Sequence, residues 1–199
     1  MRLFARSLLF LLALFLLVWV FRGALYRAIV HYEVIGERAR VGALAPMGST
    51  AQDLDAAIEM ALDTTAARLH FSTVKAVSDP QELLPGSPAN CIGYSALFAA
   101  LLNGHFVQAD LNGGYEVEHV IGKLYIGPWD VHSSFSSPFW KDHDIVRIRD
   151  KRTGVCTYVD PTLYDAIGIA RGSGPWTKTG SHEVDLAHWN SSPSPNFTA

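Results

Sequence analysis

The sequence has few cysteines and little excess of charge of either sign. Its 199 residues include only two cysteines, Cys91 and Cys156, which are too few to hold a domain of this size together by disulfide bonds. The formal net charge is -3, and no stripe of arginine or lysine follows any predicted helix. Because nucleic-acid-binding proteins present a basic face to phosphate, the chain is expected to have no nucleic-acid partner. Cysteine usage does not identify the cellular compartment.

A long hydrophobic run is present at the N-terminus. Residues 7–21 are almost entirely apolar, with Arg2 and Arg6 before them and Arg22 and Arg27 after them. Such a run is typical of a membrane-targeting segment, and the residues that follow it match a small-x-small cleavage site poorly. We predict a single-pass membrane anchor over residues 1–27, with a cleaved signal peptide as the alternative. The early positive charges favour an exported domain, on the periplasmic or extracellular side.

The remaining chain has room for one domain with a real hydrophobic core. Residues 28–48 carry charges of both signs, which indicates a juxtamembrane connector whose conformation the sequence does not decide. Ser49 and Thr50 are predicted to cap a helix with an apolar face from Leu54 to Leu69. The domain is predicted over residues 49–171. Residues 172–199 are rich in Gly, Ser, Pro, Thr and Asn, so we expect a disordered tail.

Residues 88–104 are the stretch around which the domain is organised. Pro88 and Asn90 are typical of helix beginnings, apolar residues follow at helical spacing, and Asn103 and Gly104 predict a left-handed stop. Cys91 lies in the first turn of this helix, where free N–H groups and the helix dipole favour a thiolate. Cys91 is therefore a candidate nucleophile. The plain alternative is that it is a small, buried apolar residue.

After residue 104 the sequence changes from helical to strand periodicity. Strands are predicted over residues 118–126, 142–149 and 155–159, and the last two form an antiparallel hairpin across the polar residues 150–154. In this hairpin His143, at the start of one strand, lies near Asp160, at the end of the next. The expected fold class is α+β, with helices packed on an antiparallel sheet behind an N-terminal transmembrane helix.

Cys91, His143 and Asp160 are the three groups that catalysis by a thiol nucleophile requires. A histidine takes the proton of the thiol, and a carboxylate holds the imidazole in the correct tautomer. The sequence thus predicts a Cys-His-Asp triad. Cys156 lies four residues before Asp160 and is expected to be a buried strand residue out of bonding distance of Cys91.

Three segments in this order, Asn-Cys-Ile-Gly-Tyr-Ser (90–95), Asp-His-Asp-Ile-Val (142–146) and Tyr-Val-Asp-Pro-Thr (158–162), resemble the transglutaminase-like superfamily of papain-like cysteine enzymes. The resemblance covers roughly residues 51–169. In that family the cysteine begins the central helix, the histidine begins a strand and the aspartate ends the neighbouring strand, which are the positions of Cys91, His143 and Asp160. Asp144 and Ile145 stand where the family usually has an alanine and an aromatic residue.

The resemblance implies a papain-like fold and a cysteine enzyme that acts on amide bonds, as a peptidase, an amidase or an acyltransferase. Membrane anchoring and the predicted export suggest a peptide or protein substrate, and we expect no cofactor and no metal ion. The alternative function is a non-catalytic scaffold that keeps the fold and binds a protein or peptide partner in its cleft.

Three other assignments stay open. His119, His132 and His143 with Asp142 or Asp144 form an alternative set of zinc ligands, although no His-x-x-x-His or Cys-x-x-Cys spacing supports it. The aromatic residues of the long connection before the second strand pack either in the core or in the wall of a substrate cleft; they are Trp129, Phe135, Phe139 and Trp140.

The third open assignment is the oxyanion hole. The backbone N–H of Cys91 is one expected donor. Gln81 and Asn90 are both candidates for the side-chain donor, and the sequence does not choose between them.

Overall fold

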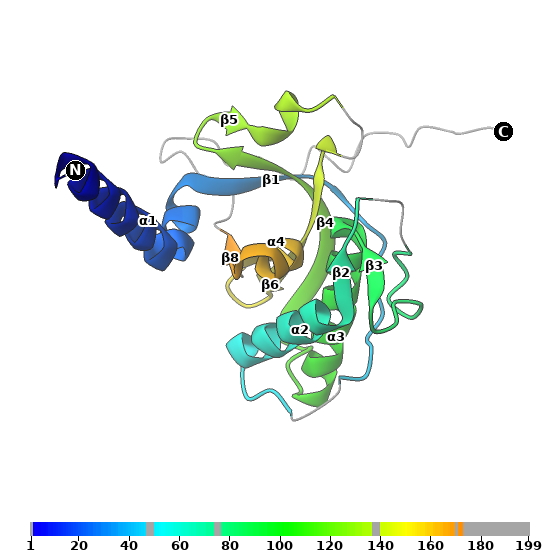
Figure 1. Cartoon of the computed structure of the whole chain (residues 1–199). Helices are drawn as coiled ribbons and strands as arrows, with labels where there is room; N and C mark the ends of the chain where they lie inside the picture. The colour runs from blue at the N-terminus through cyan, green and yellow to red at the C-terminus, as the bar shows by residue number, and fades with distance from the viewer. Residues whose placement is uncertain (1, 47–49, 74–76, 137–139, 170, 173–199) are drawn as a thin grey trace.

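The computed structural model describes residues 2–46, 50–73, 77–136, 140–169 and 171–172, and it has an α+β fold (Figure 1). The main sheet has the strand order β1-β4-β6-β7-β8, with β5 paired to the end of β4, and its pairings are antiparallel. The predicted packing of helices on an antiparallel sheet is confirmed. The elements are α1 (Arg2–Ile29), β1 (Val30–Glu37), α2 (Leu54–Arg68), β2 (Leu69–Phe71), β3 (Ser87–Ala89), α3 (Cys91–Gln108), β4 (Tyr115–Ile126), β5 (Trp129–Asp130), the 3-10 helix η1 (Val131–Ser134), β6 (His143–Asp150), β7 (Cys156–Val159), α4 (Pro161–Ile167) and β8 (Arg171–Gly172).

The predicted hairpin is present as the antiparallel pair β6 and β7. Asp150 shapes the connection, since its carboxylate accepts the backbone N–H of Arg152 at 2.8 Å, and Gly154 takes a left-handed conformation with a φ of 73°. The hairpin brings His143, the first residue of β6, close to Asp160, which follows the last residue of β7.

Residues 30–37, which we expected to belong to a connector, form the edge strand β1. This strand pairs with β4, and the register shifts between Val34 and Gly36. Val30 is 5% exposed and Tyr32 is fully buried, while the residues between and after them are more exposed, as strand alternation requires. The sheet therefore begins where α1 ends.

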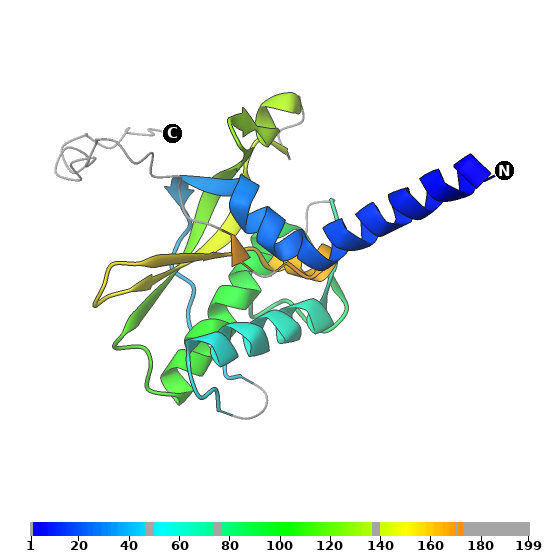
Figure 2. The same cartoon turned by 90° about the vertical axis from the view of Figure 1, so that its left-hand side faces the viewer.

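Helix α3 is the central helix of the domain. Most of its residues are buried, because it packs on β4 and β6 with one side and against α2 and α4 with the others (Figure 2). The predicted apolar face of α2 is confirmed, since Ile58, Ala61 and Leu62 are at most 1% exposed. The start of α2 was predicted wrongly: the helix begins at Leu54, and Asp53 caps it by accepting a backbone N–H.

The predicted end of α3 at Gly104 is also wrong, because the helix continues to Gln108. A Cβ atom at position 104 would lie 1.8 Å from the carbonyl oxygen of Leu44, whose own N–H donates to the carbonyl of Ala100 at 2.9 Å. Glycine is needed here for the close approach of the segment before α2, and it does not end the helix.

A short helix, α4, follows β7 and was not anticipated. Pro161 occupies its first position, where no N–H is needed for the helical ladder, and Asp160 caps it. Of the predicted tail over residues 172–199, Gly172 belongs to β8, and the other residues lie outside those that the structure describes.

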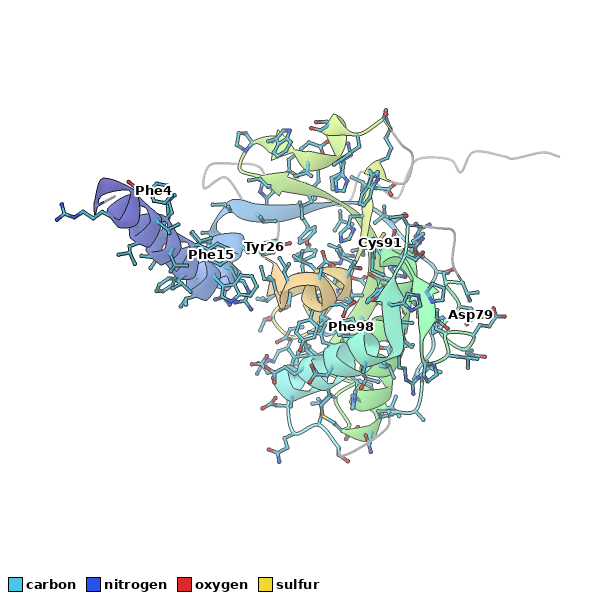
Figure 3. The ribbon with its side chains drawn as sticks, in the orientation of Figure 1. Phe4, Phe15, Tyr26, Asp79, Cys91 and Phe98 are labelled. Carbon is cyan, nitrogen blue, oxygen red and sulfur yellow. The ribbon has the colours of Figure 1, made fainter. Side chains whose placement is uncertain are left out.

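Helix α1 projects away from the domain (Figures 1 and 3). Its stretch Arg6–Ile29 is long and apolar enough to cross a membrane, a property that signal sequences share, and none of the window is buried in the protein. Its last turns contact the domain. Arg22 donates from Nε to the carbonyl of Ile167, at the end of α4, at 3.0 Å.

Candidate active site

Cys91 is the first residue of α3, at the edge of a cavity. Asn90 caps the helix, since its side-chain oxygen accepts the N–H groups of Ile92 at 3.1 Å and Gly93 at 3.4 Å. The prediction that Asn90 begins this helix is confirmed, whereas Pro88 lies in β3. The cap does not use the N–H of Cys91, which therefore remains a candidate donor to an oxyanion. The side chain of Cys91 is buried but lines the cavity.

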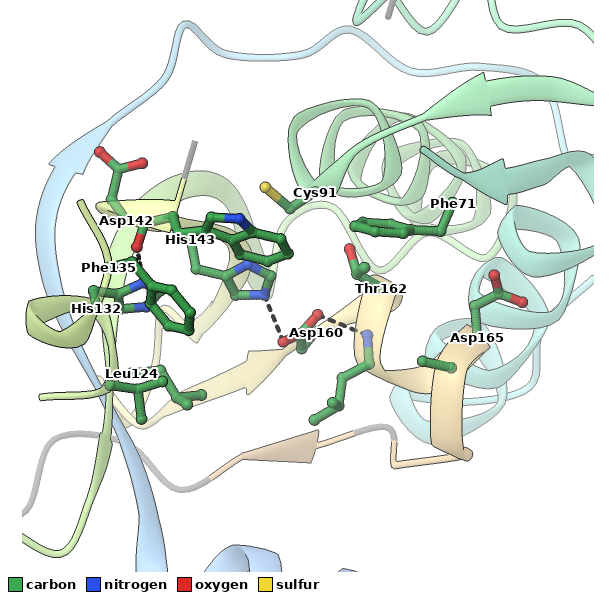
Figure 4. Close-up of a pocket in the computed structure, with 14 residues that line it drawn as sticks. Phe71, Cys91, Leu124, His132, Phe135, Asp142, His143, Asp160, Thr162 and Asp165 are labelled. Atoms are coloured by element: carbon green, nitrogen blue, oxygen red, sulfur yellow. Dashed lines mark hydrogen bonds and ion pairs between the residues drawn. The ribbon is translucent and has the colours of Figure 1, made fainter. Parts of the chain in front are cut away.

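The structure places His143 and Asp160 in contact. The Nε2 atom of His143 lies 2.7 Å from Oδ2 of Asp160 (Figure 4). Oδ1 of Asp160 accepts the N–H of Leu163 at 3.0 Å, and Oδ2 also accepts the hydroxyl of Tyr32 at 2.8 Å. Because Nε2 is engaged, Nδ1 is the ring nitrogen of His143 that is left to exchange a proton with Cys91.

The environment keeps the His143–Asp160 pair charged. Burial lowers the pKa of His143, but Asp160 and the thiolate form of Cys91 outweigh burial and hold this pKa well above its usual range. Burial raises the pKa of Asp160, but His143, the N–H of Leu163 and the hydroxyl of Tyr32 bring it below its usual value. At neutral pH the pair is thus an imidazolium and a carboxylate, which is the state that stabilises a neighbouring thiolate.

The cavity lined by Cys91, His143 and Asp160 has a volume of about 380 Å³ and mainly apolar walls (Figure 4). Phe135 and Trp140 line it and are 43% and 41% exposed, so the cleft-wall interpretation of these two aromatic residues holds and the core interpretation does not. Trp129 is exposed outside the cavity lining, and Phe139 lies outside the described residues. Phe71 and Leu124 complete the apolar wall.

A second histidine–aspartate pair lies next to the first in sequence. Asp144 is 1% exposed and accepts two hydrogen bonds from Arg38, at 2.8 and 3.1 Å. His119 Nε2 lies 2.9 Å from Asp144 Oδ1, as a close ion-pair contact rather than an aligned hydrogen bond. Burial raises the pKa of Asp144, but His119 and Arg38 have the larger effect and bring this pKa below its usual value. Asp144 is thus the centre of a buried ion-pair network with Arg38 and His119.

The residues of the alternative zinc set make separate contacts in the structure. Asp144 contacts His119, whereas His132 and His143 stack with their ring centroids 6.5 Å apart in the cavity wall. Within the described part of the chain, no group of three or more His, Cys, Asp or Glu side chains could hold a metal ion.

Two polar atoms in the cavity wall have no hydrogen-bond partner among the described residues. They are Nε2 of His132 and Oγ1 of Thr162, and both are buried. The Nδ1 atom of His132 lies 2.8 Å from the carbonyl of Trp140, so Nδ1 donates to that carbonyl and Nε2 is left without a partner among the described residues. Both atoms are therefore candidate contacts for polar groups of a substrate.

Three further residues named from the sequence are Cys156, Gln81 and Asn90. Cys156 and Cys91 are both free, and Cys156 is half-buried rather than buried, with its thiol 3.6 Å from the carbonyl of Gly154 in the hairpin connection. Gln81 is exposed in a turn, and its N–H donates to Asp79. Gln81 does not line the cavity, and the side-chain oxygen of Asn90 serves the helix cap.

Sequence reasoning missed Tyr26 and Tyr32, which stand behind Asp160. The hydroxyl of Tyr32 donates to Asp160, and the hydroxyls of Tyr26 and Tyr32 contact each other. The alternation Val-His-Tyr-Glu-Val over residues 30–34 is a strand signal that could have placed Tyr32 on an inward face. No protein-family model, curated protein or solved structure matches this chain.

Proposed function

We propose that this chain is a membrane-anchored cysteine enzyme of transglutaminase-like type that acts on amide bonds through Cys91, His143 and Asp160. One observation carries the proposal: a half-buried histidine in contact with a buried aspartate, and a cysteine at a helix N-terminus, line one cavity. The order of the three residues along the chain and the elements that bear them agree with the family that the sequence resembles.

The first step is attack on the substrate amide. The thiolate of Cys91 adds to the carbonyl carbon, and the N–H of Cys91 is placed to stabilise the oxyanion. His143 gives its Nδ1 proton to the leaving nitrogen, the C–N bond breaks and an amine departs, which leaves a thioester on Cys91. Asp160 holds Nε2 throughout, which fixes the ring orientation.

The second step releases the acyl group. His143, now neutral, removes a proton from water or from an amine, which attacks the thioester carbon and expels the thiolate of Cys91. Water gives a peptidase or amidase, and an amine gives an acyltransferase. The apolar walls at Phe71, Phe135 and Trp140 favour a peptide or protein substrate with an apolar side chain near the scissile amide.

The location proposed for the enzyme follows from α1. We infer that this helix is a single-pass anchor and that the domain lies on the exported side, since arginines precede the apolar run. A protein or peptide in that compartment is then the substrate.

The test is selective labelling of Cys91 by iodoacetamide at mildly acidic pH, with Cys156 in the same molecule as an internal reference. Mass mapping of the two cysteines gives their relative rates. Because Cys91 faces an imidazolium and Cys156 does not, Cys91 should react faster by at least about tenfold. Equal rates in the folded protein would contradict the enzyme and favour the non-catalytic scaffold.

A further inference from the structure

A line of hydrogen bonds connects the triad to the N-terminal helix. The Oδ2 atom of Asp160 accepts from His143 at 2.7 Å and from the hydroxyl of Tyr32 at 2.8 Å. The hydroxyl of Tyr32 in turn contacts that of Tyr26, which lies in the last turn of α1. Figure 3 shows Tyr26 at the end of α1 that meets the domain, whereas Phe4 and Phe15 lie on the part that projects away.

Tyr32 is a buried residue that packs against the site. Its side chain is fully buried, and its ring stacks on that of His143, with centroids 6.5 Å apart and an angle of 19° between the planes. A buried hydroxyl is costly unless it is hydrogen-bonded, and Tyr32 uses its hydroxyl on the same carboxylate oxygen that holds His143.

A second contact fixes α1 to the same segment. Helix α4 begins directly after Asp160, whose side chain caps it, and it ends at Ile167. Arg22 of α1 donates to the carbonyl of Ile167 at 3.0 Å. The end of α1 therefore contacts the Asp160 region through Tyr32 and the far end of α4 through Arg22.

We propose that the last turns of α1 are part of the working active site, and that Tyr26 acts through Tyr32 as a positioning residue for Asp160. This inference rests on the proposed function. It assigns a second role to the apolar N-terminal segment, which must stay attached to the domain for full reactivity of Cys91. Cleavage of a signal peptide after residue 26 would remove both Tyr26 and Arg22, and with them this support.

The groups that face Asp160 determine how loss of the Tyr32 hydroxyl should change the protonation of Asp160. They are His143 from β6, Tyr32 from β1 and the N–H of Leu163 from α4, with Tyr26 behind Tyr32 and Cys91 beyond His143. Without the Tyr32 hydroxyl the carboxylate of Asp160 is less stabilised, so it is protonated at a higher pH and His143 loses its partner there.

The experiment measures the rate of Cys91 alkylation by iodoacetamide in the full chain in detergent, across the pH range in which carboxylates and imidazoles titrate. Tyr32→Phe and Tyr26→Phe remove one hydroxyl each and keep the ring. Tyr125→Phe is the matched control, because the Tyr125 hydroxyl donates at 2.7 Å to an exposed carboxylate, Glu33, away from the triad. Labelling of Cys156 and the thermal midpoint report whether each variant is folded.

We expect Tyr32→Phe to move the acidic limb of the Cys91 profile upward by about 0.5 to 1 pH unit. Tyr26→Phe should move it in the same direction by less, and Tyr125→Phe should leave it unchanged. If wild-type Cys91 reacts selectively and both Tyr26→Phe and Tyr32→Phe have the wild-type profile, the inference is overturned while the proposed function stands. A shift in Tyr32→Phe alone would overturn the role of α1. Unselective labelling of the wild type would instead contradict the proposed function itself.

Discussion

The described part of the protein contains two histidine–aspartate pairs that differ in their surroundings. One pair uses His143 and the other uses Asp144, which are adjacent residues at the start of β6. His143 contacts Asp160, and His119 contacts Asp144. The carboxylate of Asp144 is also held by the guanidinium of Arg38, at 2.8 Å, whereas the other partners of Asp160 are the neutral hydroxyl of Tyr32 and a backbone N–H.

This difference separates a structural pair from one that suits proton transfer. In the Asp144 pair, Arg38 supplies a permanent positive charge, so the carboxylate is neutralised whatever the state of His119. In the Asp160 pair, His143 is the cation, its side chain is 20% exposed and it lines the cavity with Cys91. A contact between histidine and aspartate is therefore not sufficient evidence of a triad; the absence of a competing cation and the access to a nucleophile decide its role.

The largest effect should come from His143→Ala. Without the imidazolium, the thiolate of Cys91 loses its nearest positive charge, so its alkylation at mildly acidic pH should fall on the order of 100-fold. His119→Gln is the control and should keep the fast labelling of Cys91. Comparable losses in both variants would mean that the two pairs do not differ as described.

Asp144→Asn should act on stability rather than on the thiol. It removes the charge that pairs with Arg38 and His119, and the expected loss in the free energy of unfolding is about 2 kcal/mol, moderated because Arg38 is 38% exposed and can regain water. Denaturant unfolding in detergent measures it. Fast labelling of Cys91 should persist in the folded fraction, and its disappearance would show that Asp144 also controls the reactivity of Cys91.

The pH dependence of stability should reveal the charged state of the His143–Asp160 pair. The pKa of His143 is higher in the folded protein than in the unfolded chain, and this difference stabilises the fold. The stabilisation is complete at a pH below the pKa of the unfolded chain, and it is lost as the pH rises through the pKa of the folded protein. The lowered pKa of Asp160 contributes stability above its unfolded value and loses it as pH falls. The difference in unfolding free energy between wild type and Asp160→Asn should therefore be greatest between about pH 4 and 6.5. A difference that does not vary with pH would contradict the ion pair.

The smallest effect is expected for Ser95→Ala. The buried hydroxyl of Ser95, one turn after Cys91 in α3, donates to the carbonyl of Asp144 at 2.9 Å and so ties α3 to β6. Its loss should cost about 1 kcal/mol of unfolding free energy and slow Cys91 labelling only slightly. Thr65→Val is a matched control, because the Thr65 hydroxyl bonds within its own helix. If both variants label Cys91 at the same rate and Thr65→Val loses more free energy of unfolding, the Ser95 bond does not align α3 with β6.

Local patterns were enough to predict the elements that carry the triad. The apolar spacing of α3, the cap at Asn90 and the hairpin of β6 and β7 are signals within a few residues, and they placed Cys91, His143 and Asp160 correctly on their elements. The resemblance to a known family added the proposed roles of these residues.

The features that were missed depend on distant parts of the chain. Tyr32 and Asp160 are separated by 128 residues, and β1 is a strand because β4 pairs with it. Gly104 was taken for a helix end, since the reason for a glycine there is the backbone of Leu44, which the local sequence does not show. Contacts of this kind follow from tertiary packing and override the local preference.

The junction of α1 and β1 has a mechanical consequence. The apolar helix ends at Ile29 and the strand begins at Val30, so no flexible residues separate the candidate span from the sheet. A domain on a long flexible linker can take many positions and orientations relative to a bilayer. A domain joined directly to its membrane helix keeps one distance from the bilayer and one orientation. If α1 spans the membrane, the cleft can meet only groups presented at that height, and substrates would be sorted by their distance from the lipid surface before any side chain is recognised.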